Sequence, residues 1–174
     1  MIEKAPSIEK ATTGAMSNTR AAAVVEFLHG HGVAFDVVEH PYTGTAAAEA
    51  AATGRPAAEV GKTVVLQDGS TYALAIIPAS ERLDLHRVRE LLGAGAHLRL
   101  ATEAEIGRDF PLVEVGAVPP AGPGLPMAEL VDRRLLARDR VLCAGGDHQH
   151  SIVLDPRDLV RLTGAKVADL CAAT

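Results

Sequence analysis

The residue best placed to do chemistry in this chain is Lys62, which opens the apolar run 62–66 directly after Gly61. An ammonium at the mouth of a half-buried strand either extends into solvent or meets an anion in a pocket. The local sequence alone favours extension into solvent. A pocket becomes the better interpretation only if other segments of the chain close over the lysine.

Residues 116–124 are the segment best suited to close over such a pocket. They hold too many glycines and prolines for a regular strand, and we expect them to follow a strand at 113–115. Backbone N–H and C=O groups in such a loop have no neighbouring strand to pair with, so they must meet water or a ligand. The segment predicts either a rigid backbone clamp over a small substrate or a plain proline-rich loop. Its spacing is not that of a phosphate-binding glycine loop.

A polar cluster at Asp147, His148 and His150 could bind a metal ion, because carboxylate and imidazole are ordinary ligands of zinc and iron. The two histidines would point to one face of an extended segment. Catalytic metals usually take three protein ligands, and the sequence identifies no further partner for this pair beside the glycine turn. A solvated strand end is therefore favoured over a metal site.

Nucleophilic catalysis by cysteine or serine is not indicated. Cys143 lies between Leu142 and Ala144 in an apolar run, where a small buried thiol is expected. The chain has no Gly-x-Ser-x-Gly nucleophile elbow. The arginine-rich stretch 132–140 could contact an RNA backbone. Its interleaved aspartates instead favour a solvent-exposed surface without a partner.

Composition limits the classes of partner. The 174 residues suit one domain, and a net charge of −5 argues against a protein that coats nucleic acid through a broad basic surface. This balance still allows a grip on one nucleotide at an RNA end. The two cysteines do not make a disulfide framework, and no apolar run is long enough to span a bilayer. We therefore expect a cytoplasmic protein with reduced thiols.

Turn and cap signals divide the chain into short helices and strands. Residues 1–17 predict a flexible extension, and residues 18–174 predict a single domain. The Asp68-Gly69 pair predicts a hairpin, because glycine adopts the positive φ of a tight turn without steric cost. Strands are expected at 34–39, 62–67, 71–77, 97–100, 127–131, 141–144 and 150–154. Helices are expected at 19–29 behind a Ser17 or Asn18 cap, and at 46–52, 84–92, 102–109 and 155–164.

This order combines several strands with peripheral helices and shows no βαβ alternation. It indicates an α+β fold, with a mixed, largely antiparallel sheet that forms a barrel-like core and helices packed around it.

Three segments occur in an order that resembles one known family. They are Gly61-Lys62-Thr63-Val64-Val65, the loop Gly-Ala-Val-Pro-Pro-Ala-Gly at 116–122, and Gly-Gly-Asp-His-Gln-His-Ser-Ile at 145–152 followed by 158–164. With them, residues 24–170 resemble the YbaK/prolyl-tRNA-synthetase-associated (INS-like) family of aminoacyl-tRNA editing domains.

The resemblance implies a mixed sheet with a barrel-like core and a role in translation fidelity. Family members are hydrolases that cleave the ester between a wrongly attached amino acid and the terminal adenosine of tRNA, without a metal or organic cofactor. It implies a catalytic role for Lys62, which we interpret as a stabilising charge and not as nucleophile or base. The substrate-binding residues implied are Thr63, Gly116, Ala117, Val118, Pro119, Pro120, Gly122, Gly145, Gly146, Asp147 and His148. No side-chain base is adjacent in sequence, so activation of water is expected to depend on positioning and on the substrate.

The expected substrate is tRNA(Pro) that carries cysteine or alanine, hydrolysed in trans. Thr63 after the lysine resembles the cysteinyl-tRNA(Pro) deacylase branch, whereas the alanine-editing branch tends to carry Asn there, and 147–150 departs from both. The expected partners are a tRNA acceptor end with a small amino acid and prolyl-tRNA synthetase, with no membrane and no DNA. Two other functions stay open: a non-catalytic module that binds an aminoacyl or nucleotide end, and a metal-dependent hydrolase that uses Asp147, His148 and His150.

Overall fold

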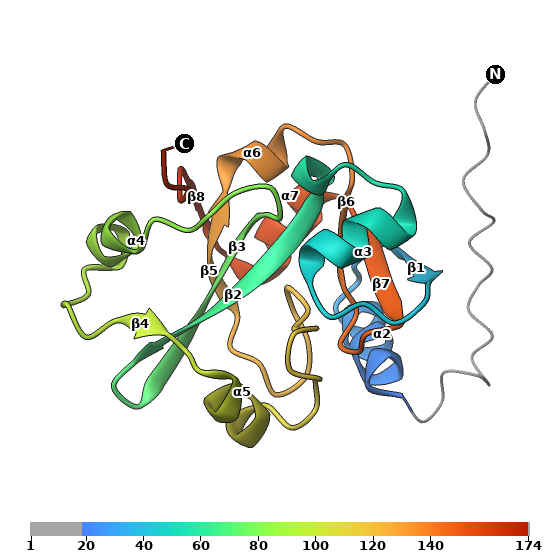
Figure 1. Ribbon diagram of the computed structural model, residues 1–174, viewed down its shortest axis with the longest axis horizontal. Coiled ribbons are helices and arrows are strands. Elements are labelled where there is room, and N and C mark those ends of the chain that lie inside the picture. The colour runs from blue at the N-terminus through green and yellow to red at the C-terminus, as the bar shows by residue number, and fades with distance from the viewer. Residues whose placement is uncertain (1–18, 174) are drawn as a thin grey trace.

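A computed structural model describes residues 19–173 of the chain (Figure 1). The extension expected at 1–17 lies outside the described residues. The helices are α2 (Arg20–Gly30), α3 (Ala46–Thr53), the 3-10 helix η1 (Ala57–Glu59), α4 (Leu85–Leu92), α5 (Glu103–Asp109), α6 (Arg133–Leu136) and α7 (Pro156–Thr163). The strands are β1 (Phe35–Glu39), β2 (Val60–Asp68), β3 (Thr71–Pro78), β4 (Arg99–Leu100), β5 (Ala128–Asp132), β6 (Val141–Ala144), β7 (His150–Leu154) and β8 (Lys166–Ala168).

All of these strands belong to one mixed sheet. Its order is β1-β7-β6-β2-β3-β5-β8, and β4 pairs with β2 beside this path. The pairs β1/β7, β6/β7, β2/β3 and β2/β4 are antiparallel, whereas β2/β6, β3/β5 and β5/β8 are parallel. The predicted α+β fold with a mixed sheet is confirmed.

Local sequence signals account for most of the element boundaries. Gly69 has a φ of +63° and allows the hairpin whose register runs from Gly61 opposite Pro78 to Asp68 opposite Thr71. Thr102 and Glu105 form the predicted capping box of α5. Threonine or aspartate side chains at 45, 84 and 155 likewise accept hydrogen bonds from the first turns of α3, α4 and α7.

The structure corrects two expectations. Helix α2 is capped by Thr19, whose hydroxyl accepts from the Ala22 N–H at 3.1 Å, and not by Ser17 or Asn18. The strand expected at 113–115 is wrong, because this segment folds into consecutive turns that close back on Phe110 and Glu114. The short strand β8 was not expected.

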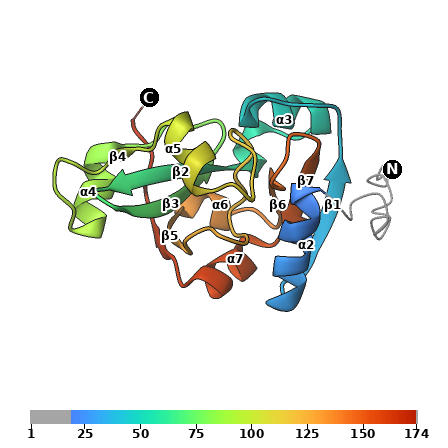
Figure 2. The same ribbon diagram turned by 90° about the horizontal axis from the view of Figure 1, so that it is seen from below.

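The apolar core lies on both faces of the sheet. On one face Val65, Leu74 and Ile76 pack in a cluster with side chains of α2, α6, α7 and the loop 110–125. On the other face Leu66 and Ile77 pack with side chains of α4 and the C-terminal segment, and a smaller cluster joins α3 to β2, β6 and β7. Figure 2 shows α3 on one side of the sheet and α2 and α7 on the other.

Strand β2 is only partly covered along one edge, and this gap positions the site. Along that edge β6 pairs with β2 at Val60 and Gly61, and β4 pairs with it at Leu66 and Gln67. Between these pairs, no strand of the described chain lies against β2. The Val65 C=O accepts from the Ala101 N–H on this edge, and alternate residues of a strand direct their peptide groups the same way. The N–H and C=O of Thr63 therefore face the gap.

Substitution of Gly61 tests whether the close approach of β2 and β6 beside this gap requires a residue without a side chain. A Cβ at this position would lie 2.8 Å from the Cys143 Sγ, which is closer than side-chain atoms tolerate. Gly61→Ala should lower the free energy of unfolding by about 1–3 kcal/mol, measured by urea denaturation, because the buried thiol has no free space to move into. Adding Cys143→Ala removes the clash, so the double variant should lose less stability than the two single variants combined. Strictly additive losses would show that the thiol does not limit this approach.

Candidate functional site

A pocket of about 370 Å³ opens at the uncovered edge of β2. It lies between helices α3 and α5, and the loop that begins at Val115 forms its remaining wall. Its lining residues are Gly44, Thr45, Ala46, Glu49, Gly61, Lys62, Thr63, Val64, Val65, Leu100, Ala101, Glu103, Ile106, Val115, Gly116, Val118 and Ala144. The volume is at the small end of the range for small-molecule sites.

Lys62 lines the pocket and is half-buried. Its Nζ donates to the backbone C=O of Glu81 at 3.3 Å, and it forms no ion pair with a carboxylate of residues 19–173. A lysine ammonium has three N–H donors, so two remain for a ligand. The side chain is therefore held in place by a neutral group while its charge stays available.

Thr63 contributes polar atoms that the protein itself does not satisfy. Its hydroxyl oxygen is buried and has no hydrogen-bond partner in the described structure. Leaving a buried hydroxyl without a partner costs about 1–3 kcal/mol, and such groups in native proteins usually mark a place for a ligand, a water or an ion. Together with the peptide groups of the same residue, the hydroxyl makes the strand edge ready to bind a polar ligand.

The loop 116–122 contributes less of its length to the pocket than the sequence predicted. Gly116 and Val118 line it, whereas the other predicted loop residues are buried away from it; these are Ala117, Pro119, Pro120 and Gly122. Gly116 has a φ of +84°, and a Cβ there would lie 3.2 Å from both the Gly44 C=O oxygen and the His148 Cε1. Glycine is needed at this position both for its backbone conformation and for the space beside it.

The polar cluster at 145–150 supports this loop by hydrogen bonds on the side away from the pocket. The Gly146 N–H donates to the Ala117 C=O, and the Asp147 carboxylate contacts His150 Nδ1 at 2.9 Å. His148 Nδ1 donates to the Thr43 C=O at 2.6 Å. Gly145, Gly146, Asp147 and His148 are thus placed behind the pocket wall and not along the pocket.

This arrangement gives no support to a metal site. His148 and His150 turn to different partners, and within residues 19–173 no three side chains of His, Cys, Asp or Glu converge on one point. Cys143 lies in β6 with no exposed surface, and burial raises the pKa of its thiol, as expected for an unreactive core cysteine.

Sequence reasoning missed two titratable residues of the pocket, the buried Glu49 and the exposed Glu103. Glu49 lines it from α3 and is only 5% exposed. Burial raises the pKa of its carboxyl to about 7, an effect that a hydrogen bond with Ser151 partly offsets. The available signal was that Glu49 is the single charged residue of the alanine-rich segment 46–53, and a surface helix would carry more.

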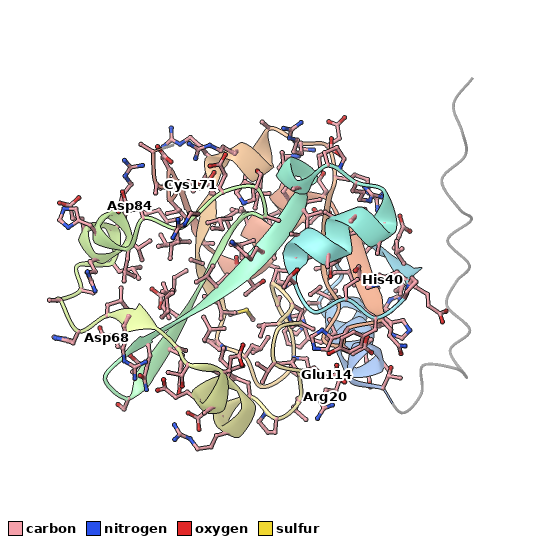
Figure 3. All side chains as sticks on the ribbon, in the orientation of Figure 1. Arg20, His40, Asp68, Asp84, Glu114 and Cys171 are labelled. Carbon is pink, nitrogen blue, oxygen red and sulfur yellow. The ribbon has the colours of Figure 1, made fainter. Side chains whose placement is uncertain are left out.

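A second hollow of about 500 Å³ adjoins the pocket and shares Val115 with it. Arg20 and Glu114 lie together at its edge and form an ion pair at 3.3 Å (Figure 3). The Tyr42 ring is 68% exposed here, and its centroid lies 4.7 Å from that of His148. The hollow therefore offers one exposed aromatic face and one arginine that is paired with a glutamate.

A model of the aminoacyl-tRNA editing domain family matches residues 40–162. The chain belongs to this family. The matched region contains the whole lining of the pocket, from Gly44 to Ala144. Family membership makes the protein an enzyme of the aminoacyl-tRNA deacylase class.

Solved structures similar to this editing domain agree with its fold. A proposed trans-editing enzyme for prolyl tRNA synthetase is 33% identical with a TM-score of 0.79, and the match covers 88% of this chain and 98% of that one. A hypothetical protein is 32% identical with a TM-score of 0.77, over 86% of this chain and 99% of that one. A structure from a study of epitope grafting onto scaffold proteins is 29% identical with a TM-score of 0.79, over 89% and 98%. A comparison with curated proteins finds no match.

Of the helices in the part of the chain that the structure describes, none combines the length and apolar character that a membrane crossing requires.

Gly116→Ala tests the importance of the pocket wall. The substitution puts a Cβ on a residue with positive φ and against the Gly44 carbonyl, so we expect a stability loss of about 1–2 kcal/mol together with a fall in deacylation of at least tenfold. Gly124→Ala is a matched control, because Gly124 has a φ of +73° and lies outside the pocket. It should lose similar stability by thermal denaturation and keep its deacylation rate. Equal rates for both variants would argue against the wall assignment.

The buried Glu49 carboxyl should make stability fall as pH rises. Its folded-state pKa of about 7 lies above the unfolded value of 4.5, so the folded state holds the proton more tightly, and stability is lost between these values. The loss should approach about 3 kcal/mol at pH 8. Denaturant unfolding of Glu49→Gln, which keeps the shape and cannot ionise, should show a smaller loss of stability from pH 5 to pH 8. Parallel stability curves for the two proteins would contradict the assignment.

Proposed function

We propose that this editing domain hydrolyses, in trans, the ester of tRNA(Pro) that carries a small wrong amino acid, with cysteine and alanine as the first candidates. The observation that carries the proposal is the convergence of three features on one pocket. These are the Lys62 ammonium, the uncovered β2 edge with the unsatisfied Thr63 hydroxyl, and the glycine wall at Gly116.

The size and lining of the pocket suit a small aminoacyl group. Ala46, Val118 and Ala144 offer short apolar surfaces, and the volume of about 370 Å³ leaves little room for a large side chain next to a ribose. Apolar pockets separate substrates that differ by one methylene or sulfur only modestly. A relaxed preference among small amino acids follows, with cysteine and alanine both accepted.

The charge of Lys62 supplies the electrostatic part of the reaction. As water attacks the ester carbonyl, negative charge develops on the carbonyl oxygen, and a cation in a partly dry pocket stabilises it more than bulk water does. The contact of the Nζ with the Glu81 C=O holds the ammonium before the substrate arrives. Lys62 acts in this proposal as a stabilising charge.

The adjoining hollow is suited to the terminal nucleotide. The exposed Tyr42 ring gives a face on which a base can stack. Arg20 is paired with Glu114 through Nη1 and bonded to the Pro111 C=O through Nε, so its remaining N–H donors are the ones that would contact a phosphate. The net charge of −5 makes an extended RNA contact unfavourable, so recognition would be confined to the acceptor end.

The comparison with a proposed trans-editing enzyme for prolyl tRNA synthetase supports the tRNA(Pro) assignment. That chain is covered over 98% of its length, so it too is about the size of one editing domain. Prolyl-tRNA synthetase is accordingly the partner we propose for delivery of the substrate. Membership of a family of editing domains favours hydrolysis over the non-catalytic binding module.

Lys62→Ala is the direct test of this function. The variant should lose about 10²–10³-fold in the rate of deacylation, as expected when a group that stabilises an oxyanion is removed. The measurement is release of the amino acid from Cys-tRNA(Pro) and Ala-tRNA(Pro), with correctly charged Pro-tRNA(Pro) as the substrate that should survive.

Lys166→Ala serves as the control, because Lys166 is an exposed lysine of β8 outside the pocket at the uncovered β2 edge. It should keep the wild-type rate. Unchanged thermal stability in both variants would tie the loss to the pocket. Full activity of Lys62→Ala on every ester that the wild type cleaves would remove the proposal.

A further inference from the structure

We propose that Glu49 is the general base of this pocket, and that Ser151, which is hydrogen-bonded to His40, acts with that histidine as a positioning group behind the carboxyl. The inference rests on the proposed deacylase function. It assigns the step that the sequence left without a residue, which is activation of the attacking water.

The position of Glu49 is unusual for a carboxyl group. The residue lies on the face of α3 that packs toward the sheet, and it is 5% exposed while the neighbouring Ala50 belongs to the core. No lysine or arginine of the described residues forms an ion pair with it. Burial of an unpaired carboxylate is costly, and nothing in the packing of an alanine-rich helix requires one here. The open side of the carboxyl faces the same pocket as Lys62.

The far side of the carboxyl is connected to a buried histidine. Ser151 has no exposed surface, and its hydroxyl acts on the Glu49 carboxyl, whose pKa it lowers. The His40 Nε2 lies 2.7 Å from the Ser151 Oγ, and the His40 Nδ1 lies 2.8 Å from the Pro41 C=O oxygen. A carbonyl oxygen only accepts, so Nδ1 carries the hydrogen, and in neutral imidazole Nε2 is then an acceptor.

The number of protons in this chain determines whether all of its hydrogen bonds form. With neutral His40, the Ser151 hydroxyl donates to Nε2, and its oxygen can accept only from a protonated Glu49. When Glu49 is ionised, the serine has one hydrogen and two acceptors, so one of the two contacts is left without a hydrogen. His40 Nε2 and the Glu49 carboxylate thus compete for one serine hydrogen, so His40 limits how far Ser151 can lower the pKa of Glu49. Burial outweighs the effect of the serine and raises the pKa of Glu49 to about 7.

The reaction balances with water as the only co-reactant. Glu49 takes a proton from water as the water oxygen bonds to the ester carbonyl carbon, and the carbonyl electron pair moves to its oxygen beside the Lys62 ammonium. When the tetrahedral species collapses, the bond to the ribose oxygen breaks, and Glu49 returns the proton to that oxygen. The products are the free amino acid and a tRNA end with its hydroxyl restored. A base with a pKa near the working pH is the most effective for such a transfer.

The elements around Glu49 carry other charged or titratable groups. They are Lys62 on β2, the buried Cys143 thiol on β6, Glu59 on η1, which pairs with Arg138, and Glu103 of α5 on the pocket rim. His148 lies beyond Gly116 in the adjoining hollow. Among these groups and the chain itself, only the histidines are of a type that commonly titrates near neutral pH. A variant of each histidine therefore belongs in the test.

The test is the pH dependence of single-turnover deacylation, with the full chain and the aminoacyl-tRNA(Pro) that the wild type cleaves best. The wild-type rate should rise with pH to a plateau, with a midpoint near 7. Glu49→Gln should lose about 10²–10⁴-fold at the plateau and should no longer show this rise. His148→Gln should retain the midpoint.

His40→Phe separates a positioning role from a purely structural one. Removal of Nε2 frees the Ser151 hydroxyl to donate to the Glu49 carboxylate, so the midpoint should move toward lower pH while the plateau stays within about tenfold. A His40 that only supports the fold would lower stability and leave the midpoint unchanged. If His40→Phe does not fold, infrared titration of the wild type against Glu49→Gln still decides, because a protonated carboxyl band should disappear near pH 7 in the wild type alone.

The outcomes separate the two proposals. A wild type that hydrolyses no mischarged tRNA at any pH overturns the proposed function and this assignment with it. A wild type that hydrolyses them, with a Glu49→Gln variant that keeps both the rate and the pH dependence, overturns the base assignment alone. An unchanged midpoint in a folded His40→Phe variant overturns the role of the chain behind Glu49.

Discussion

The two edges of strand β2 are paired to different extents, and the position of the pocket depends on this difference. One edge is paired with β3 from Gly61 to Asp68, whereas the other is paired with β6 at its beginning and with β4 near its end. Peptide groups in the uncovered interval cannot be left dry without cost. Helices α3 and α5 and the glycine loop do not cover this interval as a strand would, but surround it at the distance of a small ligand.

The pocket holds charges of both signs, and each is positioned by neutral groups. The Lys62 ammonium is held by a backbone carbonyl, and the neutral group that acts on the Glu49 carboxyl is a serine hydroxyl. Neutral hydrogen-bond partners fix the position of a charged group without cancelling its charge, which an ion pair would do. In a site that excludes much of the water, fields from such groups act on a ligand with less screening than at the surface. The ion pairs of this protein lie mostly elsewhere, on exposed arginines.

Local signals in the sequence were enough for most of the fold, and contacts between distant segments account for what was missed. The cap residues at 45, 84 and 102 and the glycine turn at 69 act within a few residues, so they could be read directly. The segment 113–115 has the composition of a strand, but its peptide groups are taken by turns. Lys62 could be recognised because it stands at the start of a strand. Glu49 could not, because its burial depends on the packing of α3 against strands β2, β6 and β7, two of which come from much later in the chain.

The parallel pairing of β2 with β6 also determines when during synthesis the pocket can exist. Val60 pairs with Leu142 of β6, the strand that closes one end of the gap. During synthesis β6 leaves the ribosome long after β2 and β3. Ser151, in β7, emerges later still. Contacts between distant segments are made late, since the chain entropy of closing a long loop must be overcome first. A nascent chain halted before β6 would carry Lys62 on an incomplete sheet, and the editing centre would be assembled only after β6 and β7 had been synthesised.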